Sequence, residues 1–281
     1  MATSKAVLIT GCSTGIGRAT AVHLAKRGWT VYATARRLDS IADLVEQGCK
    51  VLALDVCDEA SMRTAVDAVE SAEGAVGVLV NNAGYGSEGP IEEVPIDEVR
   101  RQFETNVFGL LRLTQLVLPG MRRQRWGKVV NLSSMGGRMV LPGGGVYHAT
   151  KFAIEALSDA LRFEVRGFGI DVIIIEPGAI KTAFGDTAIA RVDALGGTAD
   201  YAPFREALKQ QIRNAYEGPM AAAAVGPEVV AKVIEGAISA NRPRTRYVIT
   251  VAARMLIGLR RWLPDRGFDA ILRTQFPSPG R

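Results

Sequence analysis

The sequence predicts an α/β fold in which helices cover both faces of a doubly wound parallel sheet. Short apolar runs rich in β-branched residues alternate with helical stretches along the 281 residues. Most of these runs are almost continuously apolar, as is typical of parallel strands buried on both faces. A glycine-rich turn joins the first run to the first helix. Because crossovers between parallel strands are right-handed, these observations together predict a Rossmann arrangement.

Seven strands and three helices can be placed along the chain. The strands are expected at residues 6–10, 30–35, 50–55, 78–81, 128–132, 170–176 and 247–250. One helix covers residues 19–27 and ends at Gly28, a residue that commonly terminates helices. Asp58 opens a second helix, because acidic side chains favour the N-terminal dipole. A third helix is expected at residues 147–166 and stops at Gly167.

Residues 1–281 are expected to form one domain with two additions. Residues 183–227 interrupt the alternation with glycines and prolines between short helical pieces. Long insertions of this kind are often lids, so this region is a candidate substrate lid, with a disordered surface excursion as the alternative. Its alanine run, residues 221–224, is expected to begin or precede a helix. Residues 251–281 form a basic C-terminal extension.

The composition narrows the class of protein. With 48% apolar and 22% charged residues, the chain is globular rather than disordered. Its three cysteines have neither the spacing of a zinc site nor the even count of a disulfide framework, which indicates a reducing compartment. No signal-peptide pattern and no apolar run of about 18 residues is seen. We therefore expect a cytoplasmic protein, and we expect no bound metal.

The net charge of +5 is concentrated near the C-terminus. From Arg242 onward there are nine arginines against Asp265 and Asp269, so the remainder of the chain sums to −2. This segment could contact anionic lipid or an acidic partner, or it could simply be a solvated surface helix. No nucleic-acid-binding motif accompanies the charge, so no nucleic acid is expected as a partner.

The first turn predicts a dinucleotide site. Its glycines permit a tight turn, and the following helix N-terminus faces the negative charge of a pyrophosphate. The predicted contacts are Gly11, Ser13, Thr14, Gly15, Ile16 and Gly17. Cys12 lies in the same turn, where the helix N-terminus could lower its thiol pKa, although we expect a structural role for it.

The end of the second strand predicts the cofactor. Arg36 and Arg37 stand where an NAD-specific site would place an acid, and arginines suit the 2′-phosphate of NADP(H). NADP(H) is therefore favoured over NAD(H), although Asp39 lies close by. The alternative is that these are ordinary exposed arginines.

Tyr147 and Lys151 are four residues apart, which places them on one helix face. A phenol ionises near pH ~10, and a neighbouring ammonium together with the positive nicotinamide ring would lower that pKa toward the range of a useful base. Ser134, 13 residues upstream, follows the fifth strand and could hydrogen-bond a substrate oxygen. These three side chains are the candidate catalytic group.

Together these motifs resemble the short-chain dehydrogenase/reductase family, in its compact, non-extended branch. The matching pieces span roughly residues 5–182 in the family's order: residues 10–17, Asp55, Val56, residues 81–84, Asn106, Ser134, Tyr147, Lys151, Pro177 and Gly178. The resemblance implies that Tyr147 is the general acid/base and that Ser134 binds the substrate oxygen. It further implies that Lys151 tunes Tyr147 and holds the nicotinamide ribose, and that Asn106 anchors a water. The family's spacing favours Ser134 over Ser133.

The resemblance also implies cofactor contacts beyond the glycine turn. The residues concerned are Asp55 and Val56 by the adenine, Asn81, Ala83 and Gly84 along the cleft, Tyr147 and Lys151 at the ribose, and Pro177, Gly178, Ile180 and Thr182 near the nicotinamide. Family members usually form dimers or tetramers, so a homodimer or homotetramer is expected. His23 and His148 are interpreted as a helix-surface residue and a bystander beside the site.

The expected substrate is a lipophilic alcohol, ketone or aldehyde. The apolar, glycine-rich loop at residues 135–145 could line a hydrophobic pocket with Phe184 and Phe204, or these side chains could simply pack the core. The sequence looks most like hydroxysteroid and retinol dehydrogenase-like members. Two alternatives stay open: a 3-oxoacyl-thioester reductase, and a non-catalytic redox sensor that binds NADP(H).

Overall fold

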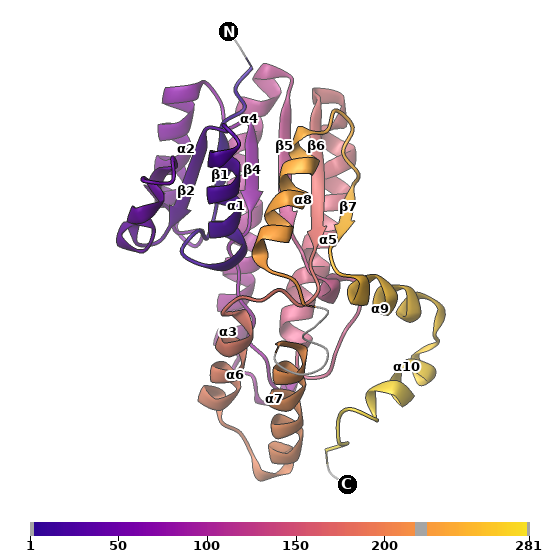
Figure 1. Cartoon of the computed structure of the whole chain (residues 1–281). Coiled ribbons are helices and arrows are strands. Elements are labelled where there is room, and N and C mark those ends of the chain that lie inside the picture. The colour runs from indigo at the N-terminus through magenta and orange to yellow at the C-terminus, as the bar shows by residue number, and fades with distance from the viewer. Residues whose placement is uncertain (1–2, 217–223, 280–281) are drawn as a thin grey trace.

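Seven parallel strands form one sheet in the computed structural model, which describes residues 3–216 and 224–279 (Figure 1). The strands are β1 (Val7–Ile9), β2 (Val31–Ala35), β3 (Lys50–Ala53), β4 (Val78–Asn81), β5 (Gly127–Leu132), β6 (Ile170–Glu176) and β7 (Arg246–Val248). Their order is β3-β2-β1-β4-β5-β6-β7. The predicted fold is confirmed, and each predicted strand overlaps one of these.

The strand order reverses between β1 and β4. The chain runs outward from β1 to β3 and then returns to pair β4 with β1, so that Val7 lies beside Val78. At such a switch point the connections leave in opposite directions, which opens a crevice outside the carboxyl ends of the strands. This crevice is where the glycine turn lies.

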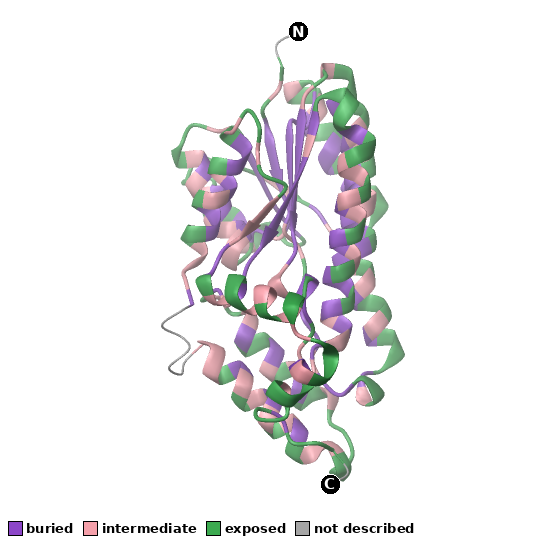
Figure 2. Cartoon of the chain, turned by 90° about the vertical axis from the view of Figure 1, so that its right-hand side faces the viewer, coloured by how far each residue is buried: buried purple, intermediate pink, exposed green. Residues whose placement is uncertain are grey.

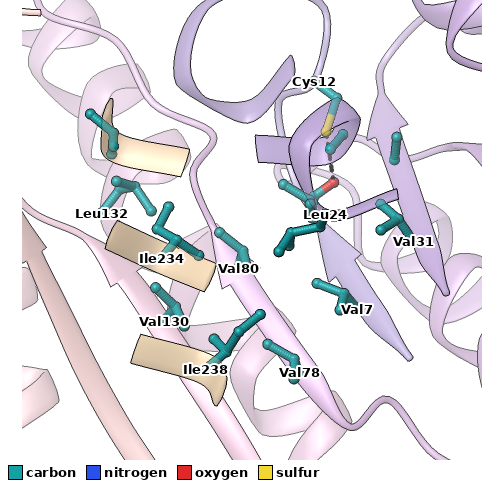
Figure 3. Packing of buried hydrophobic residues seen from close by; sticks show 14 of the residues in the cluster. Val7, Cys12, Leu24, Val31, Val78, Val80, Val130, Leu132, Ile234 and Ile238 are labelled. Atoms are coloured by element: carbon teal, nitrogen blue, oxygen red, sulfur yellow. Dashed lines mark hydrogen bonds between the residues drawn. The ribbon is translucent and has the colours of Figure 1, made fainter. Parts of the chain in front are cut away.

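Helices cover the sheet on both faces. Along β1, the side chains of Val7 and Ile9 face one hydrophobic layer and Leu8 faces the other, as the two-residue period of a strand requires. The helices of the first layer are α1 (Gly15–Lys26) and α8 (Pro227–Ser239). Those of the second are α2 (Glu59–Glu73), α4 (Gly109–Gln124) and α5 (Gly145–Val165). Figure 2 shows the buried sheet between the two helical layers, and Figure 3 shows Ile234 and Ile238 of α8 beside strand residues of the first layer.

The helix ends follow the local sequence with one exception. Asp58 caps α2 by accepting a 2.9 Å hydrogen bond from the Ala60 amide, and Gly28 follows α1 with a φ of +82°. The exception is the terminating glycine of α5. The helix ends at Val165, within two residues of the predicted stop at Gly167, but a 3₁₀ turn, Arg166–Phe168, follows, and Gly169 is the residue with the left-handed φ of +75°.

The candidate lid is largely helical in the described residues. It contains α6 (Phe184–Leu195) and α7 (Ala202–Tyr216), which lie with α3 (Ile96–Phe103) beyond the carboxyl ends of the strands (Figure 1). A separate hydrophobic cluster joins α6 to α7. Residues 217–223, including most of the alanine run, lie outside the described part, and Ala224 precedes α8.

After β7 the chain forms α9 (Val251–Trp262) and α10 (Asp265–Leu272), which lie to one side of the sheet (Figure 1). The terminal segment then returns to the lid, where the rings of Phe276 and Phe204 lie 5.7 Å apart. Among the described residues, no helix has both the length and the apolar character needed to cross a membrane.

Candidate active site

The glycine turn fits a dinucleotide pyrophosphate. Gly11 and Gly15 have φ values of +73° and +59°, which favour glycine. A Cβ at Gly17 would lie 2.4 Å from the carbonyl oxygen of Gly11, so no larger residue fits there. The N-cap residue of α1, Thr14, makes no side-chain cap hydrogen bond, and no acid occupies the first turn. The first amides of α1 therefore remain available to a phosphate.

Asn82, which belongs to the predicted motif of residues 81–84, holds this turn in place. Its Nδ2 donates to the carbonyl oxygens of Thr10 at 2.9 Å and Gly11 at 3.1 Å. In return, the Thr10 hydroxyl accepts from the amides of Asn82 and Ala83, each at 3.0 Å. These bonds join the ends of β1 and β4 at the switch point, so the turn has a fixed shape.

Asn81, a predicted cofactor contact, points its side chain into the protein. Its Nδ2 donates to Thr114 at 3.0 Å and to Asn131 at 2.9 Å, and Asn131 donates to Ser158 at 2.9 Å. This buried network joins β4 and β5 to α4 and α5. Any cofactor contact at Asn81 would therefore come from its main chain.

The arginine pair lies at the exposed end of β2. Arg36 and Arg37 are both exposed, and the Nε of Arg37 lies 3.6 Å from a carboxylate oxygen of Asp39. Neither partner of this ion pair is buried, so the pairing is weak and a phosphate could displace Asp39. Asp55 lies at the end of β3, where its carboxylate accepts a 2.9 Å hydrogen bond from the Cys57 amide, and the neighbouring Val56 is buried.

Ser134 and Tyr147 meet in the crevice, as the family resemblance implies. The Ser134 hydroxyl accepts a 3.0 Å bond from the Gly136 amide and lies near enough to the Tyr147 phenol to lower the phenol pKa. The side chain of Ser133 lies instead next to Gly137, on the other side of the loop. This geometry favours Ser134 over Ser133 as the partner of a substrate oxygen.

In the protein alone, the pKa of Tyr147 is set mainly by burial. Burial raises it above the usual value for a tyrosine, and the nearby Ser134 hydroxyl only partly offsets that increase. The Nζ of Lys151 lies 5.6 Å from the centre of the Tyr147 ring. In the protein alone, desolvation therefore favours the protonated phenol of Tyr147 at neutral pH.

Lys151 is buried one helical turn beyond Tyr147. Its Nζ donates a 2.7 Å hydrogen bond to the carbonyl oxygen of Leu132. Burial lowers the pKa of Lys151 to about 8, while the nearby Glu155 acts in the opposite direction. The ammonium is thus close to its titration point at physiological pH.

Asn106 lies in a π-helical turn, Glu104–Phe108, between α3 and α4. Its Oδ1 accepts from the Tyr85 amide at 3.0 Å, and its Nδ2 donates to the Tyr85 carbonyl at 2.8 Å and to the Thr150 hydroxyl at 3.1 Å. Gly84 packs against this side chain beside Lys151. Both amide protons of Asn106 are already donated, to the Tyr85 carbonyl and the Thr150 hydroxyl. The predicted water would therefore have to act as a hydrogen-bond donor, for example to Oδ1 of Asn106. π-helical turns frequently mark functional sites.

The segment after β6 closes the other side of the crevice. The Pro177 carbonyl accepts a 2.9 Å bond from the Met135 amide, and a Cβ at Gly178 would lie only 2.2 Å from the Thr250 hydroxyl. Ile180 is buried in the core. Thr182 lies opposite the glycine turn, where its methyl group would be 3.4 Å from a Cβ at Gly15.

Aromatic side chains form the wall next to Tyr147. Its ring lies 5.5 Å from that of Phe184, and both pack against Gly86. Phe204 does not line this wall, because it is buried among α6, α7 and the C-terminal segment. The prediction of a pocket role for Phe204 is therefore wrong. Met139 of the glycine-rich loop is likewise a core residue.

A cavity of about 350 Å³ lies beside this wall, between the Thr182 segment, α6 and α7. Its lining residues are Lys181, Thr182, Gly185, Asp186, Ile189, Ile212, Arg213 and Tyr216. Glu88 lies near both Tyr147 and Tyr216, and its charge raises the pKa of each phenol in addition to the larger effect of burial. Burial raises the pKa of Glu88 itself to about 7. Aromatic rings thus dominate this side of the site, with Glu88 close to two of the phenols and with charged side chains in the cavity lining.

His148 is not a bystander. Its Nδ1 lies 2.9 Å from the Gly136 carbonyl oxygen, and its Nε2 accepts a 3.2 Å bond from the Leu141 amide. Burial lowers the pKa of His148, so the neutral ring that these contacts require is favoured. The ring therefore holds both ends of the loop that follows Ser134.

A buried ion-pair network, which the sequence argument also missed, supports the same loop. Arg138 pairs with Glu176 at 3.0 Å, and Arg246 pairs with Glu176 at 3.2 Å and with Glu155 at 3.0 Å. Glu176 has no exposed surface. The sequence showed only that Glu155 and Glu176 stand in otherwise apolar segments. It did not show that arginines distant in sequence would pair with them.

Cys12 is inert rather than activated. Its sulfur lies 3.3 Å from the Ile9 carbonyl oxygen, and burial raises the thiol pKa to about 12 (Figure 3). The suggestion of a lowered pKa is wrong, because the sulfur points into the core and not toward the amides of α1. His23 contacts Glu235 of α8 at 2.8 Å, so it joins two helices and is not a free surface residue.

The fold and the site define an oxidoreductase built around a dinucleotide crevice. The family model described as short chain dehydrogenase matches residues 5–192. The chain belongs to this family, whose members act on CH–OH and C=O groups. The resemblance inferred from the motifs is confirmed.

Relatives include proteins named for lipid and steroid substrates. The chain is 36% identical over 271 residues to 3-ketodihydrosphingosine reductase of Bacteroides thetaiotaomicron, covering 95% of this chain and 96% of the relative. It is 37% identical over 294 residues to estradiol 17-beta-dehydrogenase 1 of Rattus norvegicus, covering 98% and 78%. It is 33% identical over 273 residues to NADPH-dependent 3-dehydrocapnine reductase of Ornithobacterium rhinotracheale, covering 94% of each.

The structure is also similar to solved structures. A short chain dehydrogenase/reductase from Burkholderia phymatum, solved in complex with NAD, is 25% identical and superimposes with a TM-score of 0.79, covering 100% of this chain and 99% of the other. Both NAD and NADPH thus occur among proteins similar to this chain.

Proposed function

We propose that this protein uses NADP(H) to interconvert a lipophilic ketone or aldehyde and the corresponding alcohol. The observation that carries this proposal is the grouping of the half-buried Tyr147 phenol with the Ser134 hydroxyl beside it and the Lys151 ammonium 5.6 Å from its ring. Reduction of a carbonyl requires a proton at the substrate oxygen, and the neutral phenol is the form that donates one.

The residues around the crevice would hold the cofactor. The glycine turn and the N-terminus of α1 suit the pyrophosphate, and Arg36 with Arg37 suits the 2′-phosphate of NADP(H). Lys151 would bind the nicotinamide ribose, and the Pro177–Thr182 segment would contact the nicotinamide. When bound, NADPH supplies the hydride, while the protein supplies position and the proton.

The side chains then have separate roles in reduction. Ser134 hydrogen-bonds the substrate oxygen and orients it toward Tyr147, whose hydroxyl donates the proton. The charge of Lys151, whose Nζ lies 5.6 Å from the centre of the Tyr147 ring, stabilises the phenolate left behind. Lys151 and a water near Asn106 return a proton to Tyr147. Alcohol oxidation uses the same steps in reverse.

A lipophilic substrate is supported by the wall of the site. The Phe184 ring lies against the Tyr147 ring, and both rings pack so closely on Gly86 that a side chain at position 86 would collide with Phe184. The names of three relatives, which refer to ketodihydrosphingosine, estradiol and dehydrocapnine, support the same class of substrate.

One observation favours a second candidate, a 3-oxoacyl-thioester reductase. Lys181 and Arg213 both line the cavity next to Thr182, and cations there suit the phosphate of a phosphopantetheine carrier. Reduction of acetoacetyl-CoA faster than of free long-chain ketones would support this candidate. If Arg213→Ala reduced acetoacetyl-CoA no faster than free ketones, the preference for thioesters would be assigned to this cavity.

The test of the proposed function is NADPH oxidation with long-chain ketones, aldehydes and acyl thioesters. We expect turnover that Tyr147→Phe reduces by about 10²- to 10⁴-fold, the usual contribution of general acid catalysis, while NADPH binding is retained. Equal turnover in Tyr147→Phe would contradict the mechanism. Tight NADPH binding without turnover of any compound would favour a redox sensor.

A further inference from the structure

Helix α9 presents an apolar stripe to solvent. Val251, Met255 and Trp262 are 69%, 70% and 84% exposed, and Leu259 is also exposed. Their spacing of four, four and three residues places all four side chains on one face of the helix. The opposite face is attached to the body of the protein through Ala253, which has no exposed surface. Figure 2 views the molecule from the side on which α9 lies.

Positive charge borders this stripe. Arg254 and Arg261 are exposed and lie seven residues apart, which puts them along the same edge of the apolar face. Arg260 lies on the other side of the helix, where it is occupied by Asp265 at 2.6 Å. Residues 251–279 contain five arginines and two aspartates, so the segment is positively charged.

We propose that this face of α9 docks on an anionic lipid surface. An exposed apolar stripe with Trp and Met, bordered by arginines, is the pattern by which a helix lies in the plane of a membrane interface. Such a helix gains from burial of its apolar face and from attraction to acidic headgroups. A tryptophan is well suited to that interface, because its ring is apolar and its indole N–H is polar.

Charge complementarity favours lipid over a second copy of the chain. In a two-fold contact of this face with itself, the same surface is presented by both partners. Arg254 and Arg261 of both copies would then lie in one interface, and like charges repel. An acidic headgroup layer offers the opposite charge over the whole length of the stripe.

The docked helix would bring the active site close to the lipid. Thr250, which caps α9 by accepting a 3.1 Å bond from the Ala253 amide, packs directly on Gly178. Gly178 belongs to the segment that closes the crevice, so α9 and the crevice lie at the same end of the sheet (Figure 1). A lipophilic substrate, if the proposed function holds, would reach the site from the membrane surface.

Sedimentation with vesicles tests this inference on the full chain. We expect the protein to bind vesicles that contain phosphatidylglycerol and to stay in the supernatant with phosphatidylcholine alone. Binding should shift the Trp262 emission to the blue, whereas Trp29 and Trp126, which pack against the core, should not respond. Met255→Ser with Trp262→Ser should weaken binding by at least about tenfold, since each substitution removes an apolar side chain that docking would bury in the lipid.

Two matched variants separate the causes. Arg254→Gln with Arg261→Gln should abolish the preference for acidic vesicles, and Phe163→Ser, which removes an equally exposed aromatic residue of α5, should change nothing. Failure of the unaltered chain to bind acidic vesicles would overturn the inference. Dissociation of an oligomer by the Met255/Trp262 variant would also overturn it, because that result would show that a second copy of the chain covers the stripe in the unaltered protein. Vesicle binding requires no turnover, so it can hold or fail independently of the proposed activity.

Discussion

The Nζ of Lys151 donates a 2.7 Å hydrogen bond to the main-chain oxygen of Leu132, the last residue of β5. Ser133 and Ser134 follow Leu132 directly, and Tyr147 lies one turn before Lys151 on α5. This bond therefore fixes the helix that carries the proposed acid against the loop that carries its hydroxyl partner. It also keeps the ammonium buried, which is the cause of its low pKa.

The first prediction concerns Lys151 and pH. Because burial lowers its pKa to about 8, the ammonium loses its proton as pH rises through that value. NADPH affinity that depends on this charge should be constant below pH 8 and fall above it, by at most about tenfold per pH unit. Fluorescence titration of NADPH across this range measures it. Lys151→Arg should show no such decline, since arginine stays charged. A wild-type affinity independent of pH would contradict the argument.

The second prediction concerns Glu88. Burial raises its pKa from 4.5 to about 7, so the folded protein holds this proton more tightly than the unfolded chain does. The stability of the wild type should therefore fall as pH rises from 4.5 to 7, relative to Glu88→Gln, which cannot ionise. Thermal unfolding should give similar Tm values below pH 4.5 and a higher Tm for the variant above pH 7. A variant less stable than wild type above pH 7 would show that the carboxylate is favourably bound.

The third prediction separates the two cofactors. Arg36→Ala with Arg37→Ala should weaken NADPH binding by about 10- to 100-fold, because charge-assisted hydrogen bonds to the 2′-phosphate are lost. NADH, which lacks that phosphate, is the internal control and should bind unchanged. Asp39→Asn should strengthen NADPH binding modestly by releasing Arg37. Equal loss of both cofactors would refute a phosphate-specific role.

The fourth prediction tests the shape of the turn. A methyl group at Gly17 would lie 2.4 Å from the Gly11 carbonyl oxygen and equally close to the Asn82 side chain. Gly17→Ala should therefore lower stability and weaken NADPH and NADH alike. Gly236→Ala is the matched control, because this helical glycine has no atom within 4 Å of the added carbon. It should stabilise the protein by up to about 1 kcal/mol through helix propensity. Normal cofactor binding by Gly17→Ala would show that the turn can relax.

Local features of the sequence predicted the strands, the glycine turn and the Tyr147–Lys151 pair, because each of these depends only on residues close together in the chain. The two-residue period of buried strands, the stop at Gly28 and the four-residue spacing of a helix face each depend on neighbours along the chain. The family resemblance added the order of these motifs, and the matching family model confirms that the chain belongs to the family.

The sequence by itself determined the class of enzyme and the residues that meet in its crevice. Only the tertiary structure decided how those residues are held and charged. The bonds of Asn82 to Gly11 and of His148 to the serine loop join segments that are distant in sequence. The high pKa of Tyr147 and the low pKa of Lys151 arise from burial, which is a sum over contacts from many elements. No local pattern contains that sum. The lowered pKa of Tyr147 beside Lys151 and a positive nicotinamide ring stays a prediction for the cofactor complex.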